Sequence, residues 1–313
     1  MDAADALHRL HLTCVEPLII AARKRRRLAA LGLERLDDIP YGTVDLAAGG
    51  RGCAGTCAAA LAAERRYLSR YLAAPGRLPV PPALRGIPAV ITLDRYPDFA
   101  GYAARVRRHS KGGILRQVRR ARAQGFVCRQ FYSDFYRRQR FAIDTSRRFR
   151  SGLVLASLLR RPPVSEFPAG LDMAEIAAYL GRPAREIGEG CPLPEPPAPA
   201  CTRHWQIDWG IFLPEEGAAG DRRERLVGYI LLRRSGSIVR TAGVMGHGAY
   251  LAQHVMKLLF HDVMEWLLRR TDPSVQGIQY LLYGAVEHGN DGLFAWKRSF
   301  EFEPLRFCWR VTS

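Results

Sequence analysis

The sequence predicts an α/β fold: a mixed sheet flanked by helices, behind a mainly helical N-terminal extension. Two observations predict this class. Residues 204–244 hold three strand-like runs rich in β-branched and aromatic residues. A long amphipathic stretch follows at 250–270, and a further buried apolar run at 277–284. A long helix between strands in chain order is typical of a mixed sheet covered by helices.

The elements before residue 204 are predicted from shorter signals. Residues 1–90 are predicted to be helical and loop-rich, and the Pro/Gly-rich segment 74–88 leads into a short apolar strand. Ser110 is predicted to be the N-cap of a basic helix that ends at Gly125. Residues 161–203 are predicted to be irregular, with a Pro-rich loop near 186–203. The remaining predictions are helices at 2–12, 54–73, 98–109 and 133–152, and strands at 89–93 and 126–131.

The C-terminal order is predicted as three strands, one long helix, a strand, a short helix and a last strand. The strands are expected within 204–213, 225–244, 277–284 and 305–311. The long helix carries one apolar stripe that includes Leu251, Leu258 and Leu267. The order therefore supports one α/β domain over 91–313, with 1–90 as the extension.

The composition limits the classes of protein to which this chain could belong. Apolar residues make up 48% of the chain, in the range of globular proteins. No apolar run approaches the roughly 20 residues that a membrane-spanning helix needs. In residues 18–33 the basic residues lie between two apolar runs, the reverse of a signal peptide. The seven cysteines have irregular spacing, which argues against a disulfide framework. These features predict a cytoplasmic protein without a transmembrane segment.

Positive charge is concentrated in one segment. The formal net charge is +17, and residues 101–150 carry fifteen Lys and Arg against two acids, Asp134 and Asp144. Such a patch indicates a polyanionic partner: tRNA, a nucleotide, coenzyme A, or a membrane surface contacted peripherally. The alternative is compositional bias, because the chain has only four lysines and abundant Arg, Ala, Gly and Pro. High-GC coding alone would produce that bias.

Two segments resemble a known superfamily. Residues 292–304, GLFAWKRSFEFEP, resemble the closing segment of the GCN5-related N-acetyltransferase (GNAT) fold and, more narrowly, of its FemAB-like, aminoacyl-tRNA-dependent branch. Residues 109–126 resemble the basic helix of the same branch, with Lys111, Arg116, Arg120 and Gly125 in comparable places. The matching positions in the closing segment are Gly292, Leu293, Trp296, Lys297, Phe300, Phe302 and Pro304.

Three departures from the family pattern stand out. Glu301 occupies a position where the family usually has glycine, so the local turn is expected to differ. Residues 1–90 are too few for the second GNAT-like domain of the Fem enzymes. The acetyl-CoA loop is represented only by residues 244–251, VMGHGAYL. Gly246 and Gly248 would present N–H groups to a phosphate there, although a plain turn is the favoured interpretation.

The resemblance implies acyl or aminoacyl transfer from acyl-CoA or aminoacyl-tRNA to an amine acceptor, a small molecule or a peptide. No tightly bound cofactor is expected. Lys297 would supply charge to an oxyanion or a donor phosphate, and His288 or Glu287 would take a proton. The simplest alternative for Lys297 is a solvated surface residue. The implied donor-binding residues are Lys111, Arg116, Arg119, Arg120, Gly246, His247, Gly248 and Tyr250, and the implied substrate pocket is Trp296, Asn290 and Phe300.

A second class of function stays open. A non-catalytic protein of GNAT shape would bind nucleic acid or another polyanion through its Arg-rich face. Metal chemistry is not predicted. Cys53 and Cys57 are four residues apart, but no second Cys/His pair was recognised at a convincing spacing.

Overall fold

The computed structural model describes most of the chain. The helix predicted at 2–12 lies outside the described residues. Within them, no helix is both long and apolar enough to cross a bilayer. The described ranges are 16–33, 35–47, 56–71, 85–147, 149–150, 153–154, 162–167, 172–181, 187, 192–216 and 222–312.

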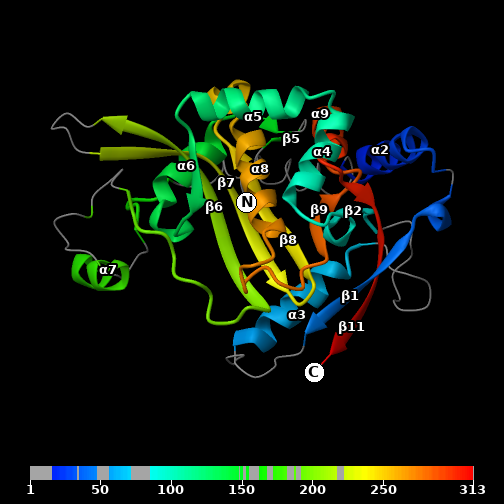
Figure 1. Cartoon of the computed structure of the whole chain (residues 1–313), viewed down its shortest axis with the longest axis horizontal. Helices are drawn as coiled ribbons and strands as arrows, with labels where there is room; N and C mark the ends of the chain where they lie inside the picture. The colour runs from blue at the N-terminus through cyan, green and yellow to red at the C-terminus, as the bar shows by residue number, and fades with distance from the viewer. Residues whose placement is uncertain are drawn as a thin grey trace, which may run out of the picture.

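The centre of the molecule is a seven-stranded mixed sheet in the order β10-β2-β9-β8-β7-β6-β3 (Figure 1). Neighbouring strands are antiparallel except β8 and β9, which are parallel. The predicted mixed α/β fold is thereby confirmed. The strands are β2 (Pro88–Thr92), β3 (Val127–Gln130), β6 (His204–Glu216), β7 (Arg222–Ser235), β8 (Ile238–Gly246), β9 (Tyr280–Ala285) and β10 (Glu303–Pro304).

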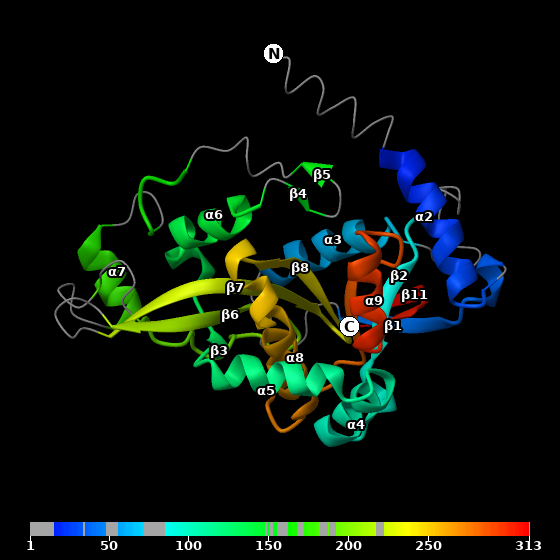
Figure 2. The ribbon, with the colours of Figure 1, turned by 90° about the horizontal axis from the view of Figure 1, so that it is seen from above.

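Helices cover both faces of the sheet (Figure 2). On one side lie α4 (Phe99–His109), α5 (Gly113–Ala123) and α8 (Val255–Leu268). Their apolar faces form the main core with β6, β7 and β9. On the other side lie α3 (Thr56–Leu68) and α6 (Arg137–Thr145). A second core joins α6 to α7 (Met173–Leu180), and β4 (Phe149–Arg150) pairs with β5 (Leu153–Val154).

The structure corrects three predictions. Helix α7 lies within the region predicted to be irregular, and Asp172 and Glu175 form its capping box. Ser110 caps the C-terminus of α4, whereas Gly112, with φ +75°, precedes α5. The long helix begins at Val255, because residues Gly248–Gln253 form a 3-10 helix and His254 adopts a left-handed conformation. Gly125, with φ +86°, follows α5 as predicted.

The N-terminal extension contains elements that the sequence reasoning missed. These are α2 (Glu16–Ala30) and β1 (Tyr41–Ala47). β1 pairs in parallel with β11 (Arg306–Thr312) over seven residue pairs, and together they form a separate two-stranded sheet. The last strand was correctly predicted, but it does not belong to the central sheet.

The sheet splits between β8 and β9. These two strands pair over only three residue pairs, from Ile238–Tyr280 to Arg240–Leu282. Beyond that point β8 continues to Gly246 on β7, and β9 continues to Ala285 on β2. The turn that follows Ala285 carries Glu287 and His288 and leads into α9 (Asp291–Ser299), which carries Lys297.

Candidate functional site

The turn after β9 and helix α9 bring two of the three predicted catalytic residues, His288 and Lys297, to the backbone of Ala285. The Nζ atom of Lys297, on α9, donates to the carbonyl oxygen of Ala285 at 2.7 Å. The Ala285 N–H donates to Nδ1 of His288 at 3.4 Å. Glu287 lies between Ala285 and His288 in the chain. A single turn and the first two turns of a helix therefore assemble the group.

Lys297 is buried, with 3% of its surface exposed. Its Nζ lies 4.8 Å from the centroid of the Tyr283 ring, a cation–π contact. Burial lowers the pKa of Lys297 to about 7, Arg27 adds to the shift, and Glu287 opposes it. The interpretation as a solvated surface lysine is therefore wrong. An amine with this pKa exchanges protons readily near neutral pH.

Glu287 is also buried, with 1% exposed. Both of its carboxylate oxygens accept from the Ile87 N–H at 3.1 Å, which ties the turn to the start of β2. Burial raises the pKa of Glu287, and its hydrogen bonds and the charges of Lys24 and Lys297 partly offset that rise. The carboxylate thus serves as a counter-charge for Lys297.

His288 retains an exposed surface, while its Nδ1 faces the Ala285 N–H. Desolvation of the ring, with further contributions from the charges of Lys297 and Arg27, lowers the pKa of His288 to about 4. The imidazole is consequently neutral at pH 7. An imidazole with so low a pKa is a weak base, and its Nδ1 already accepts from the Ala285 N–H.

Arg27, on α2, completes this cluster and was not predicted. Its guanidinium donates to the carbonyl oxygens of Val286 at 2.7 Å, His288 at 3.1 Å and Gly289 at 2.7 Å. Only 1% of Arg27 is exposed. It lies within a run of five basic residues, 23–27, so nothing local distinguishes the buried member of that run from its solvated neighbours.

The predicted substrate-pocket residues have structural partners. Phe300 is 1% exposed and lies in the main core, and the rings of Trp296 and Phe300 pack against Phe260 with centroid distances of 4.9 and 4.8 Å. Asn290 caps α9 by accepting from the Leu293 N–H at 3.0 Å. Their contact with a substrate stays a prediction.

Glu301 adopts a left-handed backbone conformation, with φ +68°. Glycine favours this conformation because it lacks a Cβ atom. The departure from the family pattern therefore changes the side chain and keeps a glycine-type turn. The Glu301 carboxylate is buried, and it pairs with Arg105 Nε at 2.6 Å and with His109 Nδ1, both on α4.

Three of the four predicted basic residues on α5 and its approach line one hollow. Lys111, Arg116 and Arg119 surround a hollow of about 880 Å³ between α4 and α5. Arg120 does not line the hollow, and its charge acts on His254, the residue before α8. The other cations that line the hollow are Arg107, Arg108 and Arg122, the last of which pairs with Asp262 at 2.6 Å.

The turn at 246–250 uses its backbone N–H groups within the protein. The His247 N–H donates to the Val227 carbonyl oxygen at 2.8 Å, and the Gly248 N–H donates to Ser146 Oγ at 2.9 Å. Gly246 pairs with Gly228 in the β8–β7 ladder. Tyr250 closes the turn through its N–H to the His247 carbonyl oxygen. These bonds fit the plain-turn interpretation.

Comparison with known proteins gives no family. No protein-family model and no curated protein matches the chain. A solved C-terminal domain (DUF2156) of a putative lysylphosphatidylglycerol synthetase from Agrobacterium fabrum is similar at 13% identity and TM-score 0.33, over 70% of this chain and 58% of that one. A tandem GNAT protein from the clavulanic acid biosynthesis pathway is similar at 15% identity and TM-score 0.33, over 85% and 73%. Both likenesses are distant, and neither assigns a function to this chain.

Proposed function

We propose that this chain transfers an acyl or aminoacyl group from acyl-CoA or aminoacyl-tRNA to an amine acceptor. One observation carries the proposal: Lys297 and His288 both contact Ala285, and the charge of Glu287 acts on Lys297, where β8 and β9 have ceased to pair. Buried ionisable groups with strongly shifted pKa values are concentrated at functional sites.

The residues fit the proton transfers of this reaction. The acceptor nitrogen forms a bond to the donor's acyl carbon, while the carbon–sulfur bond of a thioester or the carbon–oxygen bond of an aminoacyl ester breaks. Glu287, whose pKa is raised by burial, accepts the proton that the amine loses. Lys297 in its charged form stabilises the oxyanion and supplies a proton to the leaving sulfur or oxygen. Glu287 holds the charged form of Lys297 in place.

The hollow between α4 and α5 supplies the docking surface for the anionic part of the donor. Six cations line it. Arginine and lysine contacts to phosphate fix position and orientation without reading sequence. A tRNA backbone or the phosphates of coenzyme A would satisfy the same groups.

Donor titration comes first. Acetyl-CoA, longer acyl-CoAs, and charged and uncharged tRNA would be titrated by calorimetry at fixed salt, followed by turnover assays with amine acceptors. Replacing Lys297 by methionine, which keeps the buried volume, should lower turnover roughly a hundredfold or more. The control is Arg298→Met, the adjacent exposed cation on α9. Full turnover by a folded Lys297→Met protein would refute the proposed role.

A second function has one specific observation in its favour. The N–H groups of His247 and Gly248 are already hydrogen-bonded, while the hollow remains rich in cations. A non-catalytic protein that binds a polyanion would need only the cation-rich hollow. Steeply salt-dependent tRNA affinity without turnover on any donor would favour this function.

A further inference from the structure

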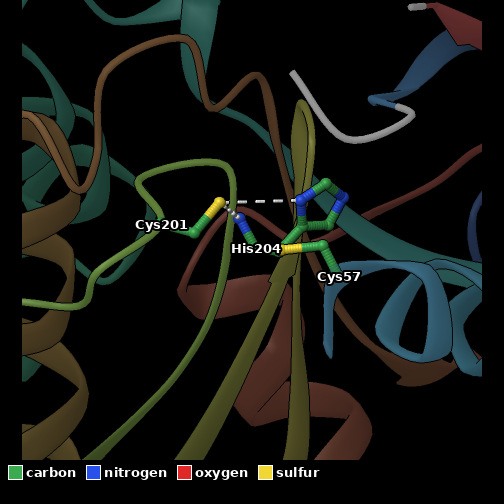
Figure 3. Close-up of side chains that lie close together, drawn as sticks. All are labelled: Cys57, Cys201 and His204. Carbon is green, nitrogen blue, oxygen red and sulfur yellow. Dashed lines mark hydrogen bonds between the residues drawn. The ribbon is translucent and has the colours of Figure 1, made fainter. Parts of the chain in front are cut away.

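Three metal-ligating side chains meet where the N-terminal extension contacts the central sheet (Figure 3). Cys57 is the second residue of α3, and Cys201 and His204 flank the start of β6 with two residues between them. One potential ligand atom from each lies within 4.8 Å of the other two. The cluster is drawn from segments more than 140 residues apart in the sequence.

The spacing is close to that of a tetrahedral metal site. Cys201 Sγ lies 3.8 Å from His204 Nδ1. Bonds of about 2.3 Å to sulfur and about 2.0–2.1 Å to nitrogen separate two tetrahedral ligands by roughly 3.5–3.8 Å. The Cys201–His204 pair already meets this requirement, and a shift of about 1 Å or less in Cys57 would bring the third ligand in.

The Cys201 sulfur lies among polar groups that fix its position. The His204 N–H donates to Cys201 Sγ at 3.3 Å. The buried guanidinium of Arg234 lies near enough for its charge to interact with Cys201. Three carbonyl oxygens, those of Gly236, Ser274 and Gln276, hold this guanidinium in place.

We propose that Cys57, Cys201 and His204 bind one Zn²⁺ ion. Two thiolates and one imidazole form a borderline-soft ligand set that zinc accepts in tetrahedral geometry. The three side chains leave one coordination position for water or another group. Because Cys57 belongs to α3, His204 begins β6 and Cys201 lies three residues before it, the ion would clamp the extension to the sheet.

This site is separate from the proposed transfer site. His204 pairs with Ser235, and Ser235 pairs with Ile238 at the beginning of β8. Ile238 in turn pairs with Tyr280 at the beginning of β9, whereas Lys297 contacts Ala285 at its end. A result against acyl transfer would therefore leave the zinc proposal unaffected, and a result against zinc binding would leave acyl transfer unaffected.

The test uses the full chain purified under reducing conditions. Zinc content is measured by mass spectrometry after dialysis, and the metal-free chain is titrated with Co²⁺ to detect the sulfur-to-cobalt charge-transfer band. We expect about one equivalent of metal. Cys57→Ser, Cys201→Ser and His204→Ala should each weaken Co²⁺ binding about tenfold or more. Cys308→Ser, at a half-buried thiol on β11, is the matched control and should bind normally.

Thiol labelling of the unaltered chain covers the case in which the variants do not fold. Zinc should slow iodoacetamide labelling of Cys57 and Cys201 but not of Cys308, and a chelator should reverse the effect. Metal-independent labelling, absence of the cobalt–thiolate band, or a Cys57–Cys201 disulfide in the unreduced protein would each overturn the proposal.

Discussion

Arg27 donates to the carbonyl oxygen of Gly289 at 2.7 Å, across 262 positions of the sequence. This bond places a residue of the N-terminal extension inside the turn that carries Glu287 and His288. The extension is thus part of the candidate site, although its separation as a domain at residue 90 stays a prediction.

Replacing Arg27 by methionine should destabilise the protein by about 3 kcal/mol, because one buried and two partly buried carbonyl oxygens lose their donor. Urea unfolding measures the change. The control is Arg26→Met: Arg26 pairs with Asp291, but its side chain is 64% exposed, so its loss should cost less than about 1 kcal/mol. Equal costs for the two variants would contradict the buried role of Arg27.

Lys297 should make stability rise with pH. Its pKa is about 7 in the folded protein and returns to the ordinary value of 10.5 on unfolding. Between these two values the unfolded chain binds one more proton than the folded chain, so the free energy of unfolding increases with pH. Below pH 7 the lysine is charged in both states and its full destabilising effect is present.

The Lys297→Met variant isolates this effect. The difference in unfolding free energy, wild type minus variant, should rise by up to about 1.4 kcal/mol per pH unit between pH 7 and 10. Urea unfolding of both proteins at several pH values measures it. A difference that is flat across this range would show that the Lys297 pKa is not lowered.

Glu301 should respond differently to glycine and to alanine. Both substitutions remove the pair with Arg105, but only glycine relieves the left-handed backbone. Glu301→Gly should therefore be more stable than Glu301→Ala by about 1 kcal/mol in thermal or urea unfolding. Glu303→Ala, at an exposed pair with Arg95, serves as the control for loss of charge. The reverse order would argue against strain at residue 301.

The basic hollow should control polyanion binding. Arg116→Glu together with Arg119→Glu should weaken tRNA binding and lower the slope of log affinity against log salt by about one for each cation removed. Fluorescence anisotropy at several salt concentrations measures both quantities. Arg65→Glu with Arg66→Glu changes the charge equally at exposed positions on α3, and it should have little effect on the slope. Equal effects of the two double substitutions would show that tRNA affinity depends on net charge alone.

The strongly periodic elements were predictable because their patterns are local. The three strands β6, β7 and β8 and helix α8 follow directly from alternation and from one apolar stripe. Helix α7 was also within reach, since Asp172 and Glu175 form a capping box before an apolar run. The parallel pairing of β1 with β11 could not be predicted, because nothing in the sequence of either strand identifies the other as its partner.

The residues of the candidate site likewise include some that a local motif predicts and others that no local pattern indicates. Lys297, Glu287 and His288 lie within eleven residues, so one motif could place them together. Arg27 and Ile87 reach the same turn from distant segments, which only tertiary structure reveals. The Cys201-x-x-His204 spacing is a weak metal signal by itself, because it joins a Pro-rich loop to a strand and the third side chain, Cys57, is remote in the sequence.

The pairing of β1 with β11 also has a consequence for protein synthesis. Tyr41 pairs with Arg306, so the first strand emerges from the ribosome long before its only partner in the two-stranded sheet exists. At about 5–20 residues per second, β1 waits on the order of 15–50 seconds for that partner. During this interval its apolar residues Val44 and Leu46, fully covered in the native state, remain without their final packing and depend on chaperones or on other parts of the nascent chain.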